Sequence, residues 1–269
     1  MGKKYFCWNI DDGLEQDKKI VDTFRKCGIG ATFNLNSGMF GKKQMIGRMG
    51  NYGIRDVPLE DFDEVADLDT LRQTAALYMQ TDTAQVPMEM LGYHNSFRIP
   101  LNEIKDVYSG FELASHGFLH ENFSSISEKE ARESIKKDVD NLSILSGRAI
   151  KGFAYPYGAV GEKTVQQLKE QGICYARTTE KAEDFSFPTD LMHIKMTGWC
   201  VDGDIYEKIK AFLQADAKED QFFLMFAHGY EFDFNTADSN WDKFHRICDM
   251  VADREDVICC STAEALLRQ

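Results

Sequence analysis

Short apolar runs alternate with longer amphipathic stretches along most of this chain of 269 residues. Short, fully apolar runs are typical of strands that are buried on both faces. We therefore expect strands at residues 4–10, 31–35, 152–155, 174–177, 222–227 and 257–260. Apolar positions at helical spacing predict helices at residues 20–27, 127–145, 162–171, 205–217, 240–252 and from 262 onward. This alternation predicts a parallel α/β sheet or barrel.

The clearest helix is the one predicted at residues 127–145. Ser127 and Glu130 form a capping box, in which each side chain satisfies a backbone N–H group of the first helical turn. One apolar stripe follows at helical spacing: Ala131, Ile135, Val139, Leu142 and Leu145. The pattern therefore indicates a helix with one buried face.

Residues 41–101 interrupt the alternation. They contain three of the five prolines and five of the eleven methionines, and one amphipathic helix is expected in them, at about 69–79. Within residues 56–89, nine acidic residues stand against one basic residue, Arg72. Because about 60 residues make only a marginal core alone, we interpret this segment as an insertion after the second strand. We expect residues 1–269 to form a single domain that carries it.

The composition argues for a globular protein and against two classes of partner. The chain is 43% hydrophobic and 12% aromatic, which is ample for a sizeable core. A net charge of −13 disfavours phosphate backbones and anionic lipid, so we expect neither a nucleic-acid nor a membrane partner. The N-terminal apolar run at residues 5–8 is too short for a signal peptide, and no run could span a membrane. We expect a cytoplasmic protein.

The seven cysteines lie mostly within or beside apolar runs. Their number is odd, and no CxxC pair occurs among them. We expect reduced, buried thiols rather than a disulfide framework or a cysteine-based zinc site.

Four motifs that could carry chemistry each follow a predicted strand, where parallel α/β folds hold their active sites. Asp11, Asp12 and Gly13 offer one carboxylate for a metal and one for a proton, although such sequences are also common in turns and helix N-caps. His116 and His120, four residues apart, would present both imidazoles to one point on a helical turn. A pair of merely packed or exposed histidines is the alternative.

The other two motifs supply a turn and a third histidine. Residues 153–158 end a strand with aromatic–Pro–aromatic–Gly, which gives a rigid turn whose N–H groups can point into a cleft, or an ordinary connection. His228 follows an apolar strand and can be a general acid or base, or a satisfied core histidine. Together the motifs match what metal-assisted hydrolysis requires: a separate base, a separate acid, and three ligands, Asp12, His116 and His120.

In this order, the motifs resemble those of the polysaccharide deacetylases, also called NodB-homology proteins or carbohydrate esterase family 4. The matching segments are residues 9–13 (TFDDG in the family), 31–34 (ATF), 115–120 (H(S/T)xxH), 153–158 (the third motif) and 224–229 (the last motif). The family fold is a distorted (β/α) barrel, often with seven strands. The resemblance therefore implies such a barrel here, with the insertion after its second strand.

The resemblance also implies a role for each motif residue. One divalent metal, usually zinc in the family, would be bound by Asp12, His116 and His120. Asp11 would be the base that activates the attacking water, and His228 the acid that protonates the leaving amine or alcohol. The backbone N–H of Tyr157 would help the metal to hold the oxyanion.

Departures from the family pattern bear on the site. Ala154 stands where many members have an arginine that holds the base, and Arg177, after a neighbouring strand, is a candidate substitute. The family's aspartate that tunes the catalytic histidine is not evident, and Asp202 and Asp204 are candidates for it. Trp199, close to them, could help to shape the substrate pocket.

Three hypotheses for function follow. The leading one is a metal-dependent deacetylase of an N- or O-acetylated sugar or oligosaccharide. The second is a hydrolase of a non-sugar amide that uses the same site, and the third is a non-catalytic sugar-binding protein with this fold. The insertion at residues 41–101 could be a surface ornament, a lid over the sugar cleft, or a surface through which the chain forms a homo-oligomer.

Overall fold

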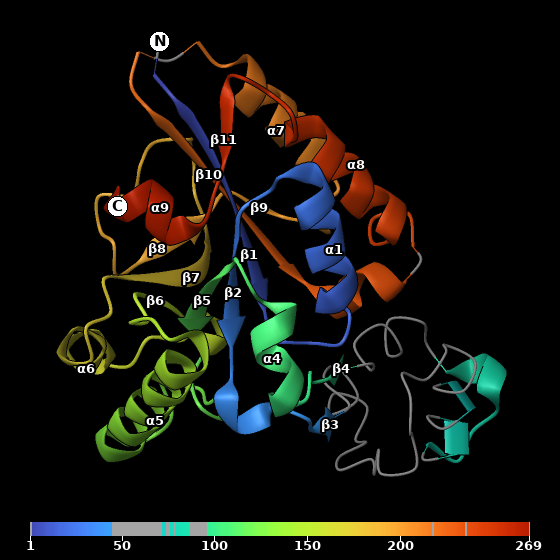
Figure 1. Cartoon of the computed structure of the whole chain (residues 1–269). Coiled ribbons are helices and arrows are strands. Elements are labelled where there is room, and N and C mark those ends of the chain that lie inside the picture. Colours follow the sequence, from blue (N-terminus) through green and yellow to red (C-terminus); the bar gives the residue numbers. More distant parts are fainter. Residues whose placement is uncertain are drawn as a thin grey trace.

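Parallel strands form a nearly closed barrel in the computed structural model of the chain (Figure 1). The structure describes residues 2–44, 72–73, 76–77, 79–86, 96–216, 218–234 and 236–268. The strands are β1 (Lys4–Asp11), β2 (Ala31–Leu35), β5 (Glu112–Ser115), β6 (Gly152–Ala154), β7 (Tyr175–Lys181), β8 (Ile194–Met196), β9 (Gly198–Trp199), β10 (Gln221–His228) and β11 (Val257–Cys259). Eight follow the order β8-β7-β6-β5-β2-β1-β10-β9, and β11 pairs with β1. The predicted distorted (β/α) barrel is confirmed.

Helices lie around the outside of this barrel (Figure 1). The α-helices with described bounds are α1 (Asp17–Cys27), α4 (Leu101–Val107), α5 (Glu128–Ser146), α6 (Thr164–Glu170), α7 (Ile205–Gln214), α8 (Trp241–Val251) and α9 (Thr262–Leu267). The predicted capping box of Ser127 and Glu130 is present at the start of α5. Helix α7 ends three residues before the predicted limit of 217, because Ala215 is already in an extended conformation.

Aromatic side chains fill much of the core. The rings of Phe6 on β1 and Phe223 on β10 stack with their centroids 4.9 Å apart, and Trp8 packs edge-on against Phe244 of α8. From Phe6 onward every residue of β1 is buried. Because β1 lies between other strands and is covered on both faces, its sequence is a nearly continuous apolar run, as expected of a central parallel strand.

The barrel closes at a segment that the sequence pattern did not predict. β8 pairs with β7, and β9 pairs with β10, with Thr197 between the two short strands. Thr197 Oγ1 accepts a hydrogen bond from the backbone N–H of Leu224 at 3.0 Å, where a strand carbonyl would otherwise accept. This division of the closing segment makes eight strands where seven were predicted. Strands of three and two residues are too short to leave an apolar period in the sequence.

The ends of the predicted insertion lie against the barrel. β3 (Lys43–Gln44) and β4 (Ser96–Phe97) pair antiparallel in a small separate sheet where the segment leaves and returns. Ile99, the second residue after β4, is fully buried in the main core. The helix predicted at about 69–79 falls largely outside the described residues.

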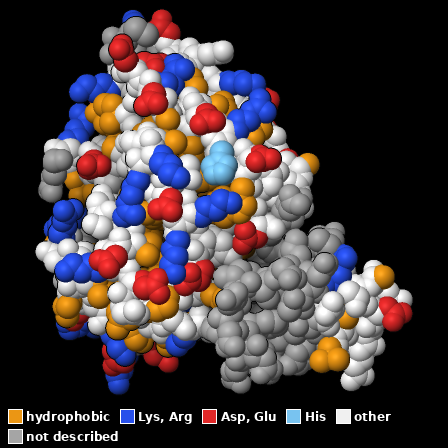
Figure 2. All heavy atoms as spheres, turned by 45° about the vertical axis from the view of Figure 1, so that its right-hand side comes forward, with side chains coloured by type: hydrophobic (Ala, Val, Ile, Leu, Met, Phe, Trp, Pro, Cys, Tyr) orange, Lys and Arg blue, Asp and Glu red, His pale blue; other side chains and the backbone are white. Residues whose placement is uncertain are grey.

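Other expectations concern the surface and the thiols. Within the described part of the chain, every helix is too short or too polar to cross a membrane. All seven cysteines are free thiols, as predicted, but only four are buried; Cys27, Cys174 and Cys259 are partly exposed. On the face over α1 and α8, acidic and basic side chains are interspersed (Figure 2).

Candidate active site

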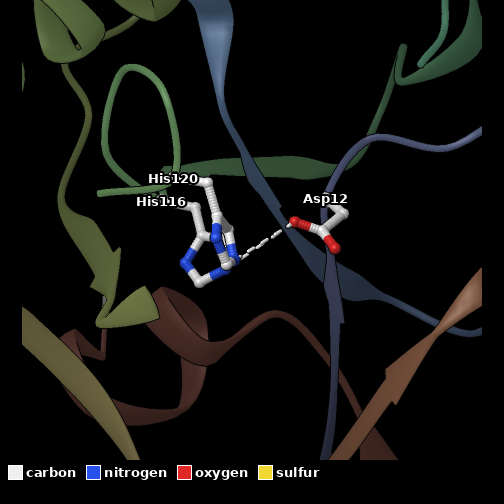
Figure 3. A group of neighbouring side chains, drawn as sticks. All are labelled: Asp12, His116 and His120. Carbon is white, nitrogen blue, oxygen red and sulfur yellow. Dashed lines mark ion pairs between the residues drawn. The ribbon is translucent and has the colours of Figure 1, made fainter. Parts of the chain in front are cut away.

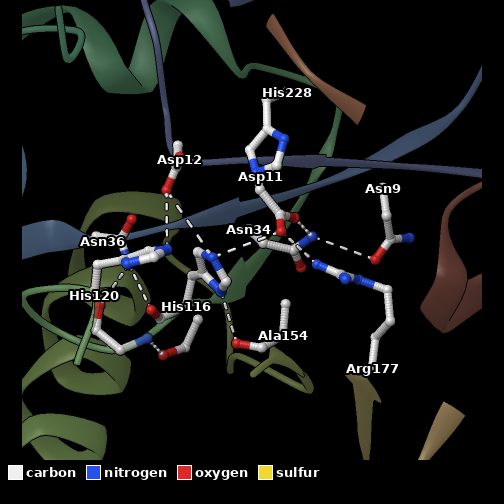
Figure 4. A network of polar contacts seen from close by, with 12 residues as sticks. Asn9, Asp11, Asp12, Asn34, Asn36, His116, His120, Ala154, Arg177 and His228 are labelled. Carbon is white, nitrogen blue, oxygen red and sulfur yellow. Dashed lines mark hydrogen bonds and ion pairs between the residues drawn. The ribbon is translucent and has the colours of Figure 1, made fainter. Parts of the chain in front are cut away.

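The carboxyl ends of the strands bring the predicted residues to one edge of the barrel (Figure 4). Asp11 is the last residue of β1 and His228 the last of β10, and the two are partners in the register of these neighbouring strands. Asp12 follows Asp11 directly, and His116 is the first residue after β5. Because the strands all run in the same direction, residues far apart in the sequence meet here.

Asp12, His116 and His120 converge on one point (Figure 3). Their ligand atoms all lie within 4.8 Å of one another. Oδ1 of Asp12 is 3.9 Å from Nε2 of His116 and 3.6 Å from Nε2 of His120. Tetrahedral zinc with bonds of about 2.0 to 2.1 Å requires ligand atoms about 3.3 Å apart. To hold such an ion the triad must contract, by about 0.3 to 0.6 Å at the two distances from Asp12 and by up to about 1.5 Å between the two histidines.

The two histidines lie in a loop, and not on the helical turn that their spacing suggested. β5 ends at Ser115 and helix α5 begins only at Glu128. Gly117 and His120 have positive φ angles of 75° and 60°. This left-handed backbone is easy for glycine and unfavourable for histidine. The turn of the loop, rather than the pitch of a helix, brings the two rings together.

Hydrogen bonds from two neighbouring elements hold this loop. Nδ2 of Asn36, just after β2, donates to the carbonyl oxygens of His116 and Gly117 at 2.5 and 3.0 Å. Oγ of Ser134, on α5, accepts a hydrogen bond from the backbone N–H of Phe118 at 2.9 Å. The histidine ligands are thus positioned by groups that do not themselves face the metal site.

The protonation of the triad suits a metal. Nδ1 of His116 lies 2.7 Å from the carbonyl oxygen of Ala154, so it carries the proton and leaves the Nε2 lone pair free to face Asp12. Burial lowers the pKa of His116 and lowers that of His120 to about 4, although the nearby carboxylates oppose both shifts. Both rings are therefore neutral at pH 7. Oδ1 of Asp12 is buried without a hydrogen bond. This donor set fits a divalent metal.

Asp11 lies beside the triad and is held by other groups. Asn34 Nδ2 donates to its Oδ1 at 2.7 Å, and Arg177 Nη2 donates to its Oδ2 at 2.5 Å. Arg177 is the register partner of Ala154 on the neighbouring strand, so the guanidinium arrives from one strand further along the sheet. Burial raises the pKa of Asp11, but Arg177 and the nearby histidines outweigh it and hold that pKa below its ordinary value. The carboxylate is ionised at neutral pH.

His228 is largely buried, and the carboxylate of Glu231 keeps its imidazole protonated. Nδ1 of His228 lies 3.1 Å from Glu231 Oε1, and its backbone N–H donates to Oε2 at 2.9 Å. Burial lowers the pKa of His228, but Glu231 outweighs it, and the pKa rises to about 9. The candidates Asp202 and Asp204 were wrong for this role. Asp202 forms an ion pair with Lys181, and Lys208 forms ion pairs with both aspartates. The missed signal was a glutamate one turn after the histidine.

A pocket of about 580 Å³ opens over these groups. Trp199 lines it, and its Nε1 donates to Glu231 Oε1 at 2.9 Å. Tyr157 is 67% exposed at the rim with its backbone in the left-handed region, and its ring centroid lies 4.7 Å from that of His120. Much of the wall is aromatic: Tyr155, Tyr157, Trp199, Phe226 and Tyr230.

One buried residue at the site was not predicted. Arg98, directly after β4, is 3% exposed, and its Nη1 lies 3.1 Å from Oδ1 of Asp12. Burial raises the pKa of Asp12, but Arg98 and the nearby histidines outweigh it and hold that pKa well below its ordinary value. The only signal in the sequence was a single charge between two apolar residues, Phe97 and Ile99.

Comparison of the sequence with known families and proteins finds similarity to polysaccharide deacetylases. The family model described as Polysaccharide deacetylase matches residues 67–176, a range that contains His116 and His120 but neither Asp12 nor His228. A peptidoglycan deacetylase of Helicobacter pylori is 26% identical over 136 residues, which are 50% of this chain and 41% of the relative. The match thus spans less than half of that relative. The resemblance predicted from the motifs is confirmed.

Solved structures share the barrel. A PuuE allantoinase superposes with a TM-score of 0.58 at 12% identity, covering 98% of this chain and 88% of its own. The Bc1960 peptidoglycan N-acetylglucosamine deacetylase superposes with a TM-score of 0.51 at 15% identity, covering 99% of this chain and 94% of its own. At such low identity, these likenesses establish the fold alone.

Proposed function

The chain is related to the polysaccharide deacetylases, and we propose that it is a metal-dependent hydrolase that removes acetyl groups from an N- or O-acetylated sugar or oligosaccharide. One observation carries the proposal: a ligand triad, an ionised carboxylate and a protonated imidazole meet at a single pocket. The residues concerned are Asp11, Asp12, His116, His120 and His228. Metal-assisted hydrolysis of an amide or ester at neutral pH uses this combination of groups.

The triad would hold one divalent ion, which we propose is zinc. Two neutral imidazoles and a carboxylate are a common zinc set that leaves a coordination position open. When bound, the ion would polarise the acetyl oxygen and make a water molecule more acidic. The remaining steps belong to side chains of this chain.

Asp11 would accept the proton of the attacking water. Its carboxylate is ionised at neutral pH, which is the form that a general base needs. Oδ2 of Asp11 lies 3.5 Å from Nε2 of His116, so the base stands beside the ligand set without belonging to it. The bonds from Arg177 and Asn34 would keep the carboxylate oriented while its charge changes.

His228 would donate a proton to the leaving nitrogen or oxygen. With a pKa raised to about 9, its imidazole is protonated at neutral pH, as a general acid must be. Glu231 would stabilise that charge and fix the ring through Nδ1, which leaves Nε2 as the donor. The backbone N–H of Tyr157 would help to stabilise the oxyanion.

Metal content and acetate release together test this proposal. We expect the purified protein to bind one equivalent of Zn²⁺ or Co²⁺ and to release acetate from N-acetylglucosamine oligomers. Asp11→Asn should abolish acetate release and retain the metal, whereas His116→Ala should lose both. The exposed Asp140→Asn on α5, which pairs only with Lys136, is the matched control and should keep both. Full turnover by Asp11→Asn would refute the assignment.

A second candidate is a hydrolase of a non-sugar amide. The third motif lacks its arginine here, and one structure with the same barrel is an allantoinase. This candidate predicts turnover of small linear or cyclic amides, with loss in Asp11→Asn, and no acetate from acetylated sugars. A non-catalytic sugar-binding protein is disfavoured because base, acid and all three ligand residues are kept. It would predict oligosaccharide binding without any acetate release in the presence of metal.

A further inference from the structure

Each carboxylate of the site has a buried arginine of its own. Arg177 contacts Asp11, and Arg98 contacts Asp12. The first pair suits a general base that must stay ionised. The second pair is unexpected, because Asp12 is the carboxylate proposed to bind the metal, and a guanidinium beside it is already a cation.

The backbone fixes Arg98 behind Asp12. Leu14 and Arg98 form an antiparallel bridge. Backbone hydrogen bonds of 2.8 and 2.9 Å on either side of it join Glu15 to Phe97 and Ile99 to Gly13. The same Nη1 that lies 3.1 Å from Oδ1 of Asp12 also donates to the carbonyl oxygen of Asp12. The guanidinium therefore holds both the main chain and the side chain of this residue.

Asp12 needs that support in two respects. Its φ angle is 86°, in the region that residues with a side chain rarely adopt, so its carbonyl is held in a strained position. Its carboxylate is 3% exposed, and a buried carboxylate without a partner is strongly destabilising. Arg98 donates a hydrogen bond to the carbonyl and forms an ion pair with the carboxylate.

The same oxygen serves two partners. Oδ1 of Asp12 lies 3.1 Å from Nη1 of Arg98 and 3.6 Å from Nε2 of His120. A metal ion held by the triad would have to share this oxygen with a guanidinium that cannot lose its charge. Repulsion between the two cations in a buried site would be strong, because little water separates them.

We propose that Arg98 is a positioning residue that acts as the internal counter-cation of Asp12, stabilising the metal-free protein and weakening its hold on a divalent metal. The proposal rests on the proposed metal site. Its consequence is a centre whose carboxylate stays paired when the metal leaves, so that the protein remains folded and can take up metal again.

Zinc affinity measured against a chromophoric chelator tests the proposal in Arg98→Gln and Arg98→Lys. Arg98→Gln removes the charge, so we expect Zn²⁺ to bind about 10-fold or more tightly than in the wild type. Arg98→Lys keeps the charge and should stay within about 3-fold of the wild-type affinity. Arg254→Gln, which breaks an exposed pair with Asp256, is the control for loss of an arginine. An unchanged or weaker affinity in Arg98→Gln would overturn the proposal.

Urea unfolding of the metal-free protein gives a second readout, and it can be measured even if Arg98→Gln is less stable than the wild type. Arg98→Gln should lower the urea concentration at the unfolding midpoint in the wild-type background. The decrease should be much smaller in the Asp12→Asn background, where the carboxylate charge that Arg98 neutralises is absent. Equal losses in both backgrounds would refute the counter-cation role.

The outcomes also separate this inference from the proposed function. Equal zinc affinity of the wild type and Arg98→Gln would refute the inference about Arg98 and would leave the proposed hydrolase function unaffected. Zinc binding by Arg98→Gln alone would support the inference and refute metal dependence of the wild-type enzyme. Absence of binding in both would refute both.

Discussion

His228 keeps its proton because of one neighbour. Both carboxylate oxygens of Glu231 are used: Oε1 faces Nδ1 of His228 and Nε1 of Trp199, and Oε2 accepts from the backbone of His228 and from the thiol of Cys200. Glu231 is 1% exposed, so its charge acts on the imidazole with little screening. In the proposed mechanism, a residue outside the family motifs would therefore set the pH dependence of activity.

Glu231→Gln should move the alkaline limit of activity to lower pH. The pKa of His228 is raised to about 9, and the protonated ring is the proposed acid, so activity is present below that pH and is lost as pH rises through it. Without the Glu231 carboxylate, burial lowers the pKa of His228 and only the smaller effects of Asp12 and Asp11 oppose it. A pH profile of kcat should thus show the variant close to wild type near pH 6 and strongly impaired near pH 8.

The exposed Glu207→Gln on α7 is the control for that measurement and should leave the profile unchanged. If activity of Glu231→Gln is lost at the same alkaline pH as that of the wild type, Glu231 is not the group that keeps His228 protonated.

The pair of Arg177 and Asp11 gives a second prediction for single residues. Removal of one partner from a buried ion pair costs about 3–5 kcal/mol, so Arg177→Ala should lower the free energy of unfolding by about that amount. Ala154 is the register partner of Arg177 and points to the same face of the sheet. The swap Ala154→Arg with Arg177→Ala should therefore recover part of the stability and of the acetate release.

Urea unfolding and kcat/KM measured on both variants check this prediction. Failure of the swap to recover either quantity would mean that the two strand positions are not equivalent in reaching Asp11.

At the scale of elements, the spacing of the histidines predicted that their rings would meet, but it predicted the wrong backbone between them. Four residues apart is one turn of a helix, but His116 and His120 lie in a loop with two left-handed residues. Hydrogen bonds from Asn36 and to Ser134 of α5 hold this loop, and a local sequence pattern does not contain such contacts. Sequence could predict which side chains meet, because strand ends converge, but not the backbone that joins them.

Asn36 should be as important to the metal site as a ligand, although it faces no metal. Asn36→Ala removes the donor for two buried carbonyls, which should cost about 1–3 kcal/mol of stability. Groups that orient metal ligands typically contribute about 10–100-fold in affinity, and we expect a loss of that size for Zn²⁺. Asn122→Ala, in the exposed turn beyond His120, is the matched control. Equal zinc affinity in Asn36→Ala and the control would show that the loop holds its shape unaided.

At the scale of the whole molecule, the sequence predicted the barrel and the edge where the candidate residues meet, but neither the closure of the barrel nor the contribution of Arg98 near the end of the insertion. Central strands such as β1 and β10 leave long apolar runs, because both of their faces are buried. β8 and β9 are too short to do so. Arg98 reaches Asp12 through an antiparallel bridge to Leu14, a contact between distant segments that no periodicity encodes.

The closing seam offers a test of the barrel as a unit. Thr197 is 6% exposed, and its hydroxyl is the acceptor for the N–H of Leu224 on β10. Thr197→Val keeps the shape of the side chain and leaves this N–H buried without a partner, which should cost about 1–3 kcal/mol. For a protein of this size, about 1 kcal/mol corresponds to about 2–4 °C in Tm.

Thermal unfolding of Thr197→Val should accordingly show a Tm several degrees below that of wild type. Thr23→Val on α1, where the hydroxyl bonds only within its own helix, is the control and should show a much smaller change. Because the ligand triad is built on β1 and the loop after β5, Zn²⁺ affinity should be preserved while the seam weakens. Loss of zinc affinity in parallel with Tm would instead mean that closure of the barrel, and not only its local loops, holds the metal site in place.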